Sequence, residues 1–375
     1  MLKVLHVPNY YKPHIGGIEQ TCHDIVDALD GQVLQKVICF SEDKKTKHQV
    51  IDGVDVVKCG VWKKIMSQSI SFAYKKELKK ILKEFHPDIM VVHFPNPFVI
   101  HYILKLSKKM NIQMMVWYHT DIVKQKLVGW FFKGQTRRIL KRSSQIICTS
   151  ALYSKASVSL KNFQSKITII PSCINEKRLK MTEEAKEKAE EIKRNYADKV
   201  IVFAVGRHVE YKGLRYLIEA SKDLDDSYKI FIAGQGPLTP ELKELASKDS
   251  KITFLGRLDD LTLNAWFSAM DIYAFPSITK NEAFGLSLAE AMYFHHPAIT
   301  FTIPGSGVNF VSLHKVTGIE VENRNAKALA VAIEKLGKDE AIRKQYGENA
   351  YQRVEENFTF EQFKRNVLDF FKDKL

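Results

Sequence analysis

The sequence predicts an α/β protein of two domains, each built around a parallel β-sheet. The chain has 375 residues, which is more than one compact domain usually holds. Short apolar runs alternate with amphipathic helical stretches, the pattern of parallel strands joined by crossover helices. The alternation stops once, in a highly charged stretch near the middle of the chain, and then begins again. That interruption is where we expect one domain to end and the next to begin.

The first predicted domain covers residues 1–175. Its first strand is LKVLHV at 2–7, which leads through a turn containing Gly16 and Gly17 into an amphipathic helix. Further apolar runs predict strands at 35–40, 88–94, 112–119, 145–150 and 166–172. Residues 176–199 are almost wholly polar, and we expect them to form a connector that contains a solvated helix.

The second predicted domain covers residues 200–356. Its strands are expected in the apolar runs at 199–206, 229–234, 251–256, 271–277 and 296–301, each followed by a helical pattern. Residues 357–375 carry five apolar positions at helical spacing, and we expect this terminal helix to dock its apolar stripe on a domain.

The composition excludes several classes of protein. The cysteines are five in number and scattered without a CxxC pair, so neither a disulfide framework nor a zinc site is predicted, and a reducing compartment fits best. The N-terminus is too polar for a signal peptide. No apolar run approaches the roughly 20 residues of a membrane-spanning helix, so we expect a soluble or peripheral protein.

Positive charge is concentrated in the first half. Residues 1–180 carry 30 lysines and arginines against 13 acidic residues, whereas residues 181–375 carry 27 against 30. A basic half favours an anionic partner, such as nucleic acid, anionic lipid or a phosphorylated substrate, although it could also serve solubility alone.

The first chemical motif follows the strand at 199–206 and reads GRHVEYKG at 206–213. In open parallel sheets, ligands bind beyond the carboxyl ends of the strands. Arg207 and Lys212 would lie there, where two cations can hold a diphosphate. The alternative is that both are ordinary exposed surface cations.

The second motif, EAFGLSLAE, contains two glutamates eight positions apart. We expect a helix to begin near Gly285, so that the amides of Phe284, Gly285 and Leu286 offer hydrogen bonds to a phosphate. Glu282 would precede that helix, and Glu290 inside it could accept hydrogen bonds from paired ribose hydroxyls. The alternatives are a partner of the helix dipole for Glu282 and a solvated helix residue for Glu290.

Together these stretches resemble retaining family-4 glycosyltransferases. EAFGLSLAE resembles the E-x7-E motif of that family, and GRHVEYKG resembles its G-R-x4-K-G stretch. PHIGGIEQ at 13–20 is similar to its Gly-Gly loop, and YHTD at 118–121 to its histidine-bearing turn. The four motifs occur in the family's order. The resemblance implies the GT-B fold, in which two Rossmann-like domains face each other across a cleft and a C-terminal helix crosses back to the first domain.

The resemblance also implies roles for individual residues. Arg207, Lys212 and the amides at Phe284, Gly285 and Leu286 would hold the donor diphosphate, and Gly16 and Gly17 would let the first-domain loop approach it. Glu290 would bind the ribose, while Glu282 would contact the sugar hydroxyls. His119 would lie over the sugar near the reacting carbon; alternatively, it is a core or capping histidine. The acidic clusters at 223–226 and 258–260 are interpreted as surface.

The family transfers sugars with retention and without an obligatory metal, so no cofactor and no metal site are expected. The donor would be a nucleotide sugar. Residues 302–318 lack an acid that many members carry after a Gly-Gly turn, and this resembles bacterial polysaccharide and O-antigen mannosyl- and rhamnosyltransferases. That favours a GDP-linked donor, with a UDP-linked one as the alternative. The acceptor would be a saccharide or a polyprenyl-diphosphate-linked saccharide.

The basic and aromatic stretch at 126–145 could lie on an anionic membrane surface, or it could be a crossover helix with its aromatic side chains in the core. We expect a cytoplasmic protein attached peripherally to the inner face of the membrane. Two other functions remain open: a sugar-nucleotide epimerase or phosphorylase on the same fold, and a nucleic-acid-binding protein. Only the charge suggests the last, because the sequence contains no motif for it, and nucleic acid is not an expected partner.

Overall fold

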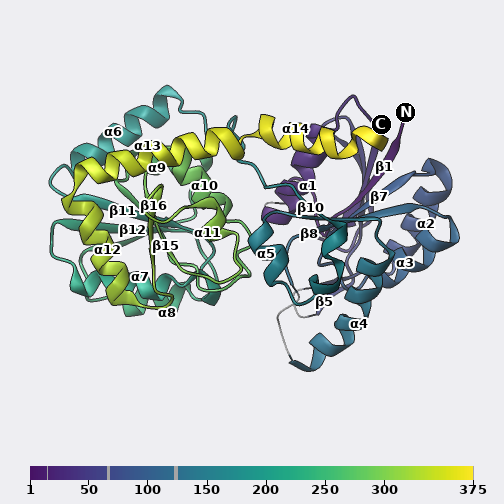
Figure 1. The fold of residues 1–375 in the computed structure, drawn as a ribbon, viewed down its shortest axis with the longest axis horizontal. Coiled ribbons are helices and arrows are strands. Elements are labelled where there is room, and N and C mark those ends of the chain that lie inside the picture. The colour runs from purple at the N-terminus through teal and green to yellow at the C-terminus, as the bar shows by residue number, and fades with distance from the viewer. Residues whose placement is uncertain (15, 66–67, 122–125, 375) are drawn as a thin grey trace. The chain divides into compact units, whose positions relative to one another are not determined.

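The structure, a computed structural model, describes residues 1–374 except 15, 66–67 and 122–125; within the helix at 126–142 it describes side chains from residue 132 onward. The chain divides into two compact units. Residues 1–172 and 361–375 form the first unit, and residues 173–360 form the second (Figure 1).

The first unit contains an eight-stranded sheet in the order β10-β9-β8-β7-β1-β2-β4-β3. All neighbouring strands are parallel except β3 and β4, which are antiparallel. The strands are β1 (Lys3–Val7), β2 (Leu34–Phe40), β3 (Lys47–Ile51), β4 (Val54–Cys59), β7 (Ile89–Phe94), β8 (Gln113–Tyr118), β9 (Gln145–Cys148) and β10 (Ile167–Ile169); a separate hairpin contains β5 (Lys63–Ile65) and β6 (Gln68–Ile70). The central strand β7 is buried at every position, as expected for a parallel strand covered on both faces.

Helices cover both faces of this sheet. They are α1 (Gly17–Ala28), α2 (Ala73–Phe85), α3 (Ile100–Lys109), α4 (Lys126–Arg142), α5 (Ala151–Ala156) and α14 (Phe360–Phe371). Cys22 of α1 packs with Val37 of β2, whereas Tyr74 of α2 packs against Phe40, three residues further along the same strand. Because successive side chains of a strand point to opposite faces, α1 and α2 lie on opposite sides of the sheet.

The second unit contains a six-stranded, fully parallel sheet in the order β13-β12-β11-β14-β15-β16. The strands are β11 (Val200–Val205), β12 (Tyr228–Ala233), β13 (Ile252–Gly256), β14 (Ile272–Phe275), β15 (Ala298–Phe301) and β16 (Gly318–Val321). The strand order reverses between β11 and β14, the kind of position at which ligands bind in open α/β sheets.

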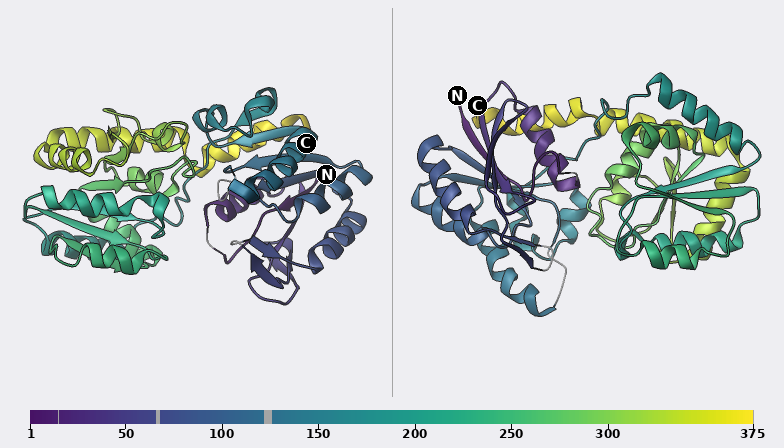
Figure 2. Two further views of the ribbon diagram at one scale, coloured as in Figure 1. Left: turned by 90° about the horizontal axis from the view of Figure 1, so that it is seen from below. Right: turned by 180° about the vertical axis from the view of Figure 1, so that it is seen from behind.

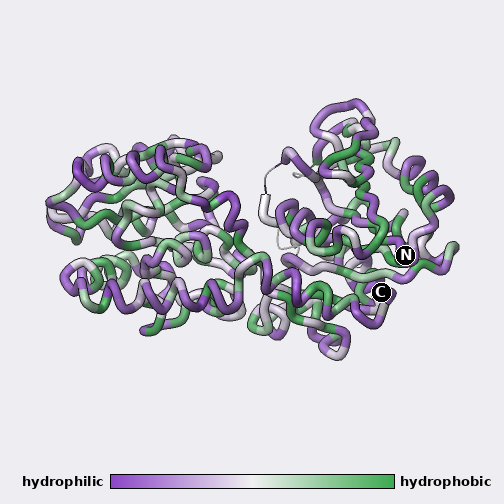
Figure 3. The backbone as a smooth tube through the Cα atoms, turned by 90° about the horizontal axis from the view of Figure 1, so that it is seen from above, coloured by the Kyte–Doolittle hydropathy of each residue, from purple (hydrophilic) through white to green (hydrophobic). Residues whose placement is uncertain are grey.

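The helices of the second unit lie on both sides of its sheet (Figures 1 and 2). They are α6 (Glu183–Asn195), α7 (Leu214–Ala220), α8 (Thr239–Leu245), α9 (Asp260–Ala269), α10 (Leu286–Tyr293), α11 (Val308–Val311), α12 (Ala326–Lys338) and α13 (Glu340–Asn357). Four of them begin at a side-chain cap, in which Thr182, Asp259, Asn325 or Asp339 accepts a hydrogen bond from a first-turn amide. The colouring of Figure 3 shows apolar strands inside each unit and more polar helices around them.

The charged segment 176–199 differs from the expected connector. It belongs to the second unit, where α6 packs along α9. Ala185, Ala189 and Ile192 are buried there, so the helix is not solvated on every side. The sequence pattern is misleading because only three small or apolar positions in thirteen face the core. At the other end of the chain, Phe363 of α14 is buried against Trp117 of β8.

None of the helices in the described part of the chain is both long enough and apolar enough to cross a lipid bilayer.

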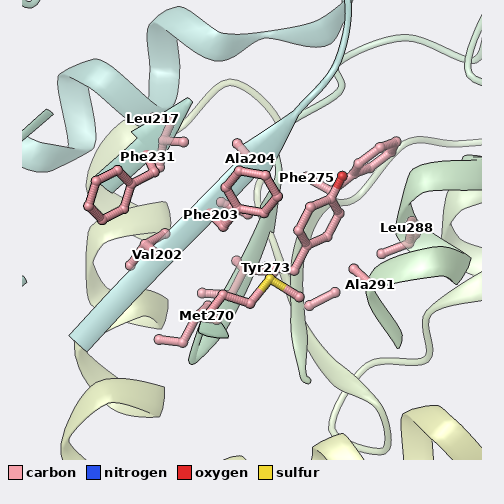
Figure 4. Packing of buried hydrophobic residues seen from close by; sticks show 14 of the residues in the cluster. Val202, Phe203, Ala204, Leu217, Phe231, Met270, Tyr273, Phe275, Leu288 and Ala291 are labelled. Carbon is pink, nitrogen blue, oxygen red and sulfur yellow. The ribbon is translucent and has the colours of Figure 1, made fainter. Parts of the chain in front are cut away.

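The core of the second unit is built around Phe203 of β11 (Figure 4). Its ring is fully buried and lies 5.8 Å from the ring of Trp266, 5.7 Å from Phe267 and 6.4 Å from Tyr273. Side chains from α9 and from the neighbouring strand β14 therefore pack around this one residue of β11.

We predict that Phe203→Ala lowers the free energy of unfolding by about 3–5 kcal/mol, because a large cavity opens among rings that cannot collapse into it. Val331→Ala, on the exposed face of α12, should change it by less than about 0.5 kcal/mol. Urea unfolding measures both. A loss below about 1 kcal/mol for Phe203→Ala would contradict this account of the core.

Candidate active site

The loop after β11 places Lys212 at the carboxyl edge of the second sheet. Its aliphatic stem runs beside Gly206, where an added Cβ would lie 3.5 Å from Lys212 Cε. Its ammonium lies 4.8 Å from the centre of the Phe275 ring, an arrangement in which the ring face stabilises the cation. Lys212 is thus held by packing before any ligand arrives.

The loop after β14 places Glu282 against that ammonium. Lys212 Nζ donates a hydrogen bond to Glu282 Oε2, and Ser277 Oγ donates to the same oxygen at 3.1 Å. Both side chains of the ion pair are only about one-seventh exposed. The two loops are also joined through their backbones, because the amide of Ile278 donates to the carbonyl of Tyr211 at 2.9 Å.

Two glycines make this close approach possible. Gly213, at the start of α7, has φ +61°, and a Cβ on it would lie 2.1 Å from the carbonyl oxygen of Pro276. Gly285, at the start of α10, has φ +92°. Both backbone conformations are strained for residues that carry a side chain.

The N-terminus of α10 opens beside Glu282. The amides of Gly285 and Leu286 donate to no acceptor among the described residues, and Phe284 before them is buried. Arg207 is exposed, and its side chain makes no ion pair within the described part of the chain. One free cation and a helix N-terminus therefore lie at the ends of neighbouring strands, β11 and β14, an arrangement suited to an anion.

Glu290 lies just over one turn into α10 and is buried. Arg178 Nη2 donates to Glu290 Oε1, and Arg178 Nη1 donates to Asp260 Oδ1 at 2.9 Å. The backbone of Arg178 is held too, since Asn264 Nδ2 donates to its carbonyl at 2.8 Å. Burial raises the pKa of Glu290 above its ordinary value, and the positive charge of Arg178 opposes that rise.

In the first unit, His119 follows β8 and is buried beside His93 of β7. Their rings are stacked at 5.3 Å, and His93 Nδ1 lies 3.1 Å from His119 Nε2 in a hydrogen bond. Burial lowers the pKa of His119 to about 3, so its ring is neutral at physiological pH. Gly16 and Gly17 follow β1 and begin α1, so they lie at the same carboxyl edge of the sheet as His119.

Comparison with known proteins gives the family. A sequence model described as "Glycosyltransferase Family 4" matches residues 15–178, and one described as "Glycosyl transferases group 1" matches residues 185–353. The chain is 31% identical over 362 residues to the O-antigen chain mannosyltransferase C of Escherichia coli, covering 96% of this chain and 95% of that protein. The chain belongs to the family-4 glycosyltransferases.

Another relative of this glycosyltransferase is the D-rhamnosyltransferase WbpZ of Pseudomonas aeruginosa. It is 27% identical over 364 residues, which cover 96% of this chain and 92% of the relative. The expected resemblance to mannosyl- and rhamnosyltransferases is therefore confirmed.

Solved structures establish the fold. The sucrose-phosphate synthase of Thermosynechococcus elongatus superposes with a TM-score of 0.81 at 18% identity, covering 100% of this chain and 99% of that one. WaaG, a glycosyltransferase involved in lipopolysaccharide biosynthesis, superposes with a TM-score of 0.73 at 15% identity, covering 98% and 99%. This glycosyltransferase has the predicted GT-B fold.

The structure brings some of the predicted residues together and adds others. Lys212, Glu282 and the start of α10 meet in one place, whereas Glu290 pairs instead with Arg178, which no motif indicated. Asp259 and Asp260 are exposed, as the surface interpretation of residues 258–260 expected; Asp259 also caps α9, and Asp260 pairs with Arg178.

Residues 302–318, where the sequence departs from the family pattern, also support the glutamate loop. Ser306 Oγ donates to the carbonyl of Glu282. A Cβ on Gly307 would lie 1.8 Å from the carbonyl oxygen of Ala283, so the two loops pack backbone against backbone. Neither contact has a local sequence signal, because the partners are more than twenty residues apart.

We predict that Arg178→Met lowers the free energy of unfolding by about 1–3 kcal/mol at neutral pH, because it leaves the buried Glu290 carboxylate without its cation. The pKa of Glu290 should then rise further above its unfolded value. A carboxyl with a raised pKa binds its proton more tightly in the folded state, so folding gains stability as the pH falls towards that pKa. The deficit should therefore shrink on acidification.

Urea unfolding at several pH values measures the deficit. The control is Arg215→Met on α7, which removes an exposed arginine whose partner is Glu219, 3.4 Å away on the same helix. It should cost less than about 0.5 kcal/mol at every pH. A deficit in Arg178→Met that stays constant with pH would mean that Glu290 is not the group left unpaired.

Proposed function

We propose that this glycosyltransferase moves a hexose, of the mannose or rhamnose type, from a nucleotide-diphosphate sugar to a saccharide acceptor, with retention of anomeric configuration. The proposal rests on the two loops after β11 and β14 in the second unit, which are joined by a backbone hydrogen bond. They present Lys212 and Glu282 in contact, next to the free amides at the start of α10. The Lys212 ammonium and the amides can bind a diphosphate, and the Glu282 carboxylate can accept hydrogen bonds from a sugar.

The leaving diphosphate is the group that gains negative charge during transfer. Arg207, Lys212 and the amides of Gly285 and Leu286 would stabilise that charge. Because Lys212 and the amides are fixed before the donor binds, they cost little reorganisation at the transition state. This supports catalysis without an obligatory metal. In such a reaction the leaving phosphate takes up the acceptor's hydroxyl proton as the new bond forms on the face that the diphosphate leaves.

The two glutamates would then serve different parts of the donor. Glu282, held by Lys212 and Ser277, accepts hydrogen bonds from sugar hydroxyls, and its fixed position orients the sugar. Glu290 accepts from the ribose hydroxyls through its second oxygen, because Arg178 takes only Oε1. In the first unit, Gly16 and Gly17 would have the role at the donor diphosphate that the resemblance implies. His119 would have the implied role at the sugar, as a neutral ring that forms hydrogen bonds.

The relatives support the choice of sugar and pathway. Two relatives that align along nearly the whole chain are named for mannosyl and D-rhamnosyl transfer, and the first of them for an O-antigen chain. We therefore favour a GDP-linked donor over a UDP-linked one, and an acceptor saccharide linked to a polyprenyl diphosphate, in the synthesis of a cell-surface polysaccharide on the cytoplasmic side of the membrane.

The direct test is release of nucleoside diphosphate from GDP-mannose, GDP-rhamnose and their UDP counterparts, with and without a lipid-linked saccharide acceptor. We expect release that depends on the acceptor, and a product linkage with the anomeric configuration of the donor by NMR. Conversion of the donor without an acceptor would favour an epimerase, and an inverted linkage would refute retention. Arg207→Ala and Lys212→Ala should each lower turnover about 30–150-fold, as expected for loss of about 2–3 kcal/mol of charge-assisted binding.

The matched controls are Arg194→Ala and Lys248→Ala, which remove exposed cations of the same unit, one on α6 and one after α8. They should leave turnover unchanged. If all four variants behave alike, the phosphate assignment is wrong.

We predict different kinetic signatures for the two glutamates. Glu290→Gln should mainly raise the donor KM, because ribose contacts are equally strong in the ground and transition states. Glu282→Gln should lower kcat more than it raises KM, since the sugar reorganises during transfer. Steady-state kinetics with varied donor separates the two, and identical signatures would refute this division of roles.

We also propose that the first unit attaches to an anionic membrane surface through α4. Phe132, Thr136, Ile139 and Leu140 of this helix are buried, and the Phe132 ring meets Phe98 at 5.8 Å. The opposite face carries exposed cations: Lys133, Arg137, Arg138 and Lys141. The helix therefore covers the sheet and presents a basic face; the side chains of Trp130 and Phe131 lie outside the described residues. Each such cation near an anionic surface contributes about 1 kcal/mol.

Cosedimentation with vesicles checks this. Binding should require anionic lipid, weaken as salt shortens the Debye length, and fall when Lys133, Arg137, Arg138 and Lys141 become Gln. Arg142 is left unchanged because its guanidinium donates to the Ile112 carbonyl.

The control replaces four exposed lysines of α2, Lys76, Lys79, Lys80 and Lys83, and should retain most binding. Equal losses would mean that total charge, not α4, is responsible; binding to neutral vesicles would exclude the electrostatic mechanism.

A further inference from the structure

Three side chains from different elements converge inside the first unit. His6 lies on β1, Cys22 on α1 and His93 on β7, and each is fully buried. One ligand atom from each, two ring nitrogens and the sulfur, lie within 4.8 Å of one another. The backbone explains the meeting: β1 pairs with β7 so that His6 is opposite Val91, which places His93 two residues further along on the same face, and α1 covers that face.

The ring nitrogens that lack partners are the second observation. His6 Nδ1 and His93 Nε2 are buried and have no hydrogen-bond partner among the described residues. Buried polar atoms are rarely left unsatisfied, and each such atom in a native structure calls for an explanation. Here two of them occur in one small cluster with a thiol.

The opposite nitrogens of both rings are already engaged. His6 Nε2 lies 3.0 Å from Gln35 Oε1, which can only accept, so Nε2 carries the proton and Nδ1 has a free lone pair. His93 Nδ1 bonds to His119 Nε2 at 3.1 Å; when Nδ1 donates, the lone pair of Nε2 is free in the same way. Gln35 is itself fixed by donating to the Val26 carbonyl of α1 at 2.9 Å. Metal-binding histidines show this pattern, in which a hydrogen bond on one nitrogen aims the other at the ion.

We propose that His6, Cys22 and His93 bind one divalent cation of the zinc class. A thiolate with two imidazoles suits zinc and excludes the hard cations magnesium and calcium, which prefer oxygen. Cys22 would bind as the thiolate and release its proton to solvent as the ion enters. Three protein ligands leave a fourth tetrahedral position for water.

The bound ion would act as a clamp between a helix and a sheet. It would tie α1 to β1 and β7 a short distance below Gly16 and Gly17, and it would lie one hydrogen bond away from His119. This role is structural and does not depend on the proposed transfer reaction. A glycosyltransferase whose chemistry needs no metal can contain such a site.

The test uses the full-length protein, expressed in medium supplemented with zinc because a buried site forms as the chain folds. Elemental analysis should find about one zinc per chain, and protein expressed with cobalt should show a thiolate-to-cobalt charge-transfer band in the near ultraviolet. Both should disappear in Cys22→Ser. They should remain in Cys148→Ala, which removes an equally buried cysteine of β9 outside the cluster.

Thermal unfolding of the unmodified protein gives a second measurement, in case Cys22→Ser folds poorly. A strong chelator should lower Tm, and the shift should be reversed by zinc but not by magnesium. Absence of metal from well-folded protein, together with no cobalt band, would overturn the proposal and leave a buried water as the partner of the two nitrogens. Zinc retained at full occupancy in folded Cys22→Ser would also overturn it, because the ligands would then lie elsewhere.

Discussion

Parallel strands can be joined only by a crossover that carries the chain back along the sheet, and this constraint determines where polar chemistry can occur in the molecule. The crossovers put helices on both faces of each sheet, so strands such as β7 are buried throughout. Polar groups that must meet a substrate arriving from solvent are left with the loops at the carboxyl edge. Arg207, Lys212 and Glu282 in the second unit follow strands in this way, and so do Gly16, Gly17 and His119 in the first.

Within the candidate site, each carboxylate is paired with a cation from a different loop. Glu282 pairs with Lys212 and Glu290 with Arg178, and both carboxylates are largely withdrawn from water. An unpaired charge in either place would be costly. In the proposed reaction, the pairs would keep two anions beside the place where a third, the diphosphate, binds. Arg207 has no such partner among the described residues, so its full charge would be available to the proposed ligand.

The sequence predicted what is encoded locally. The eleven apolar runs all contain strands, because an apolar run between turn residues has few other stable conformations. The start of α10 was predictable because Gly285 breaks the pattern just before it. Strands β3, β4 and β16 and the hairpin of β5 and β6 were missed, since polar residues interrupt their apolar positions. The contact of Arg178 with Glu290 joins residues 112 apart, and the cluster of His6, Cys22 and His93 depends on strand pairing; periodicity records neither.

The backbone bond between Ile278 and Tyr211 has a consequence for how such an enzyme can diverge. It couples the lysine-bearing loop to the glutamate-bearing loop. Gly213 also packs directly against Pro276, where an added Cβ would lie 2.1 Å from the carbonyl oxygen. An insertion in either loop would separate the charges that must act together. Lineages that adopt a new sugar are therefore expected to exchange side chains around this frame and to keep the lengths of both loops.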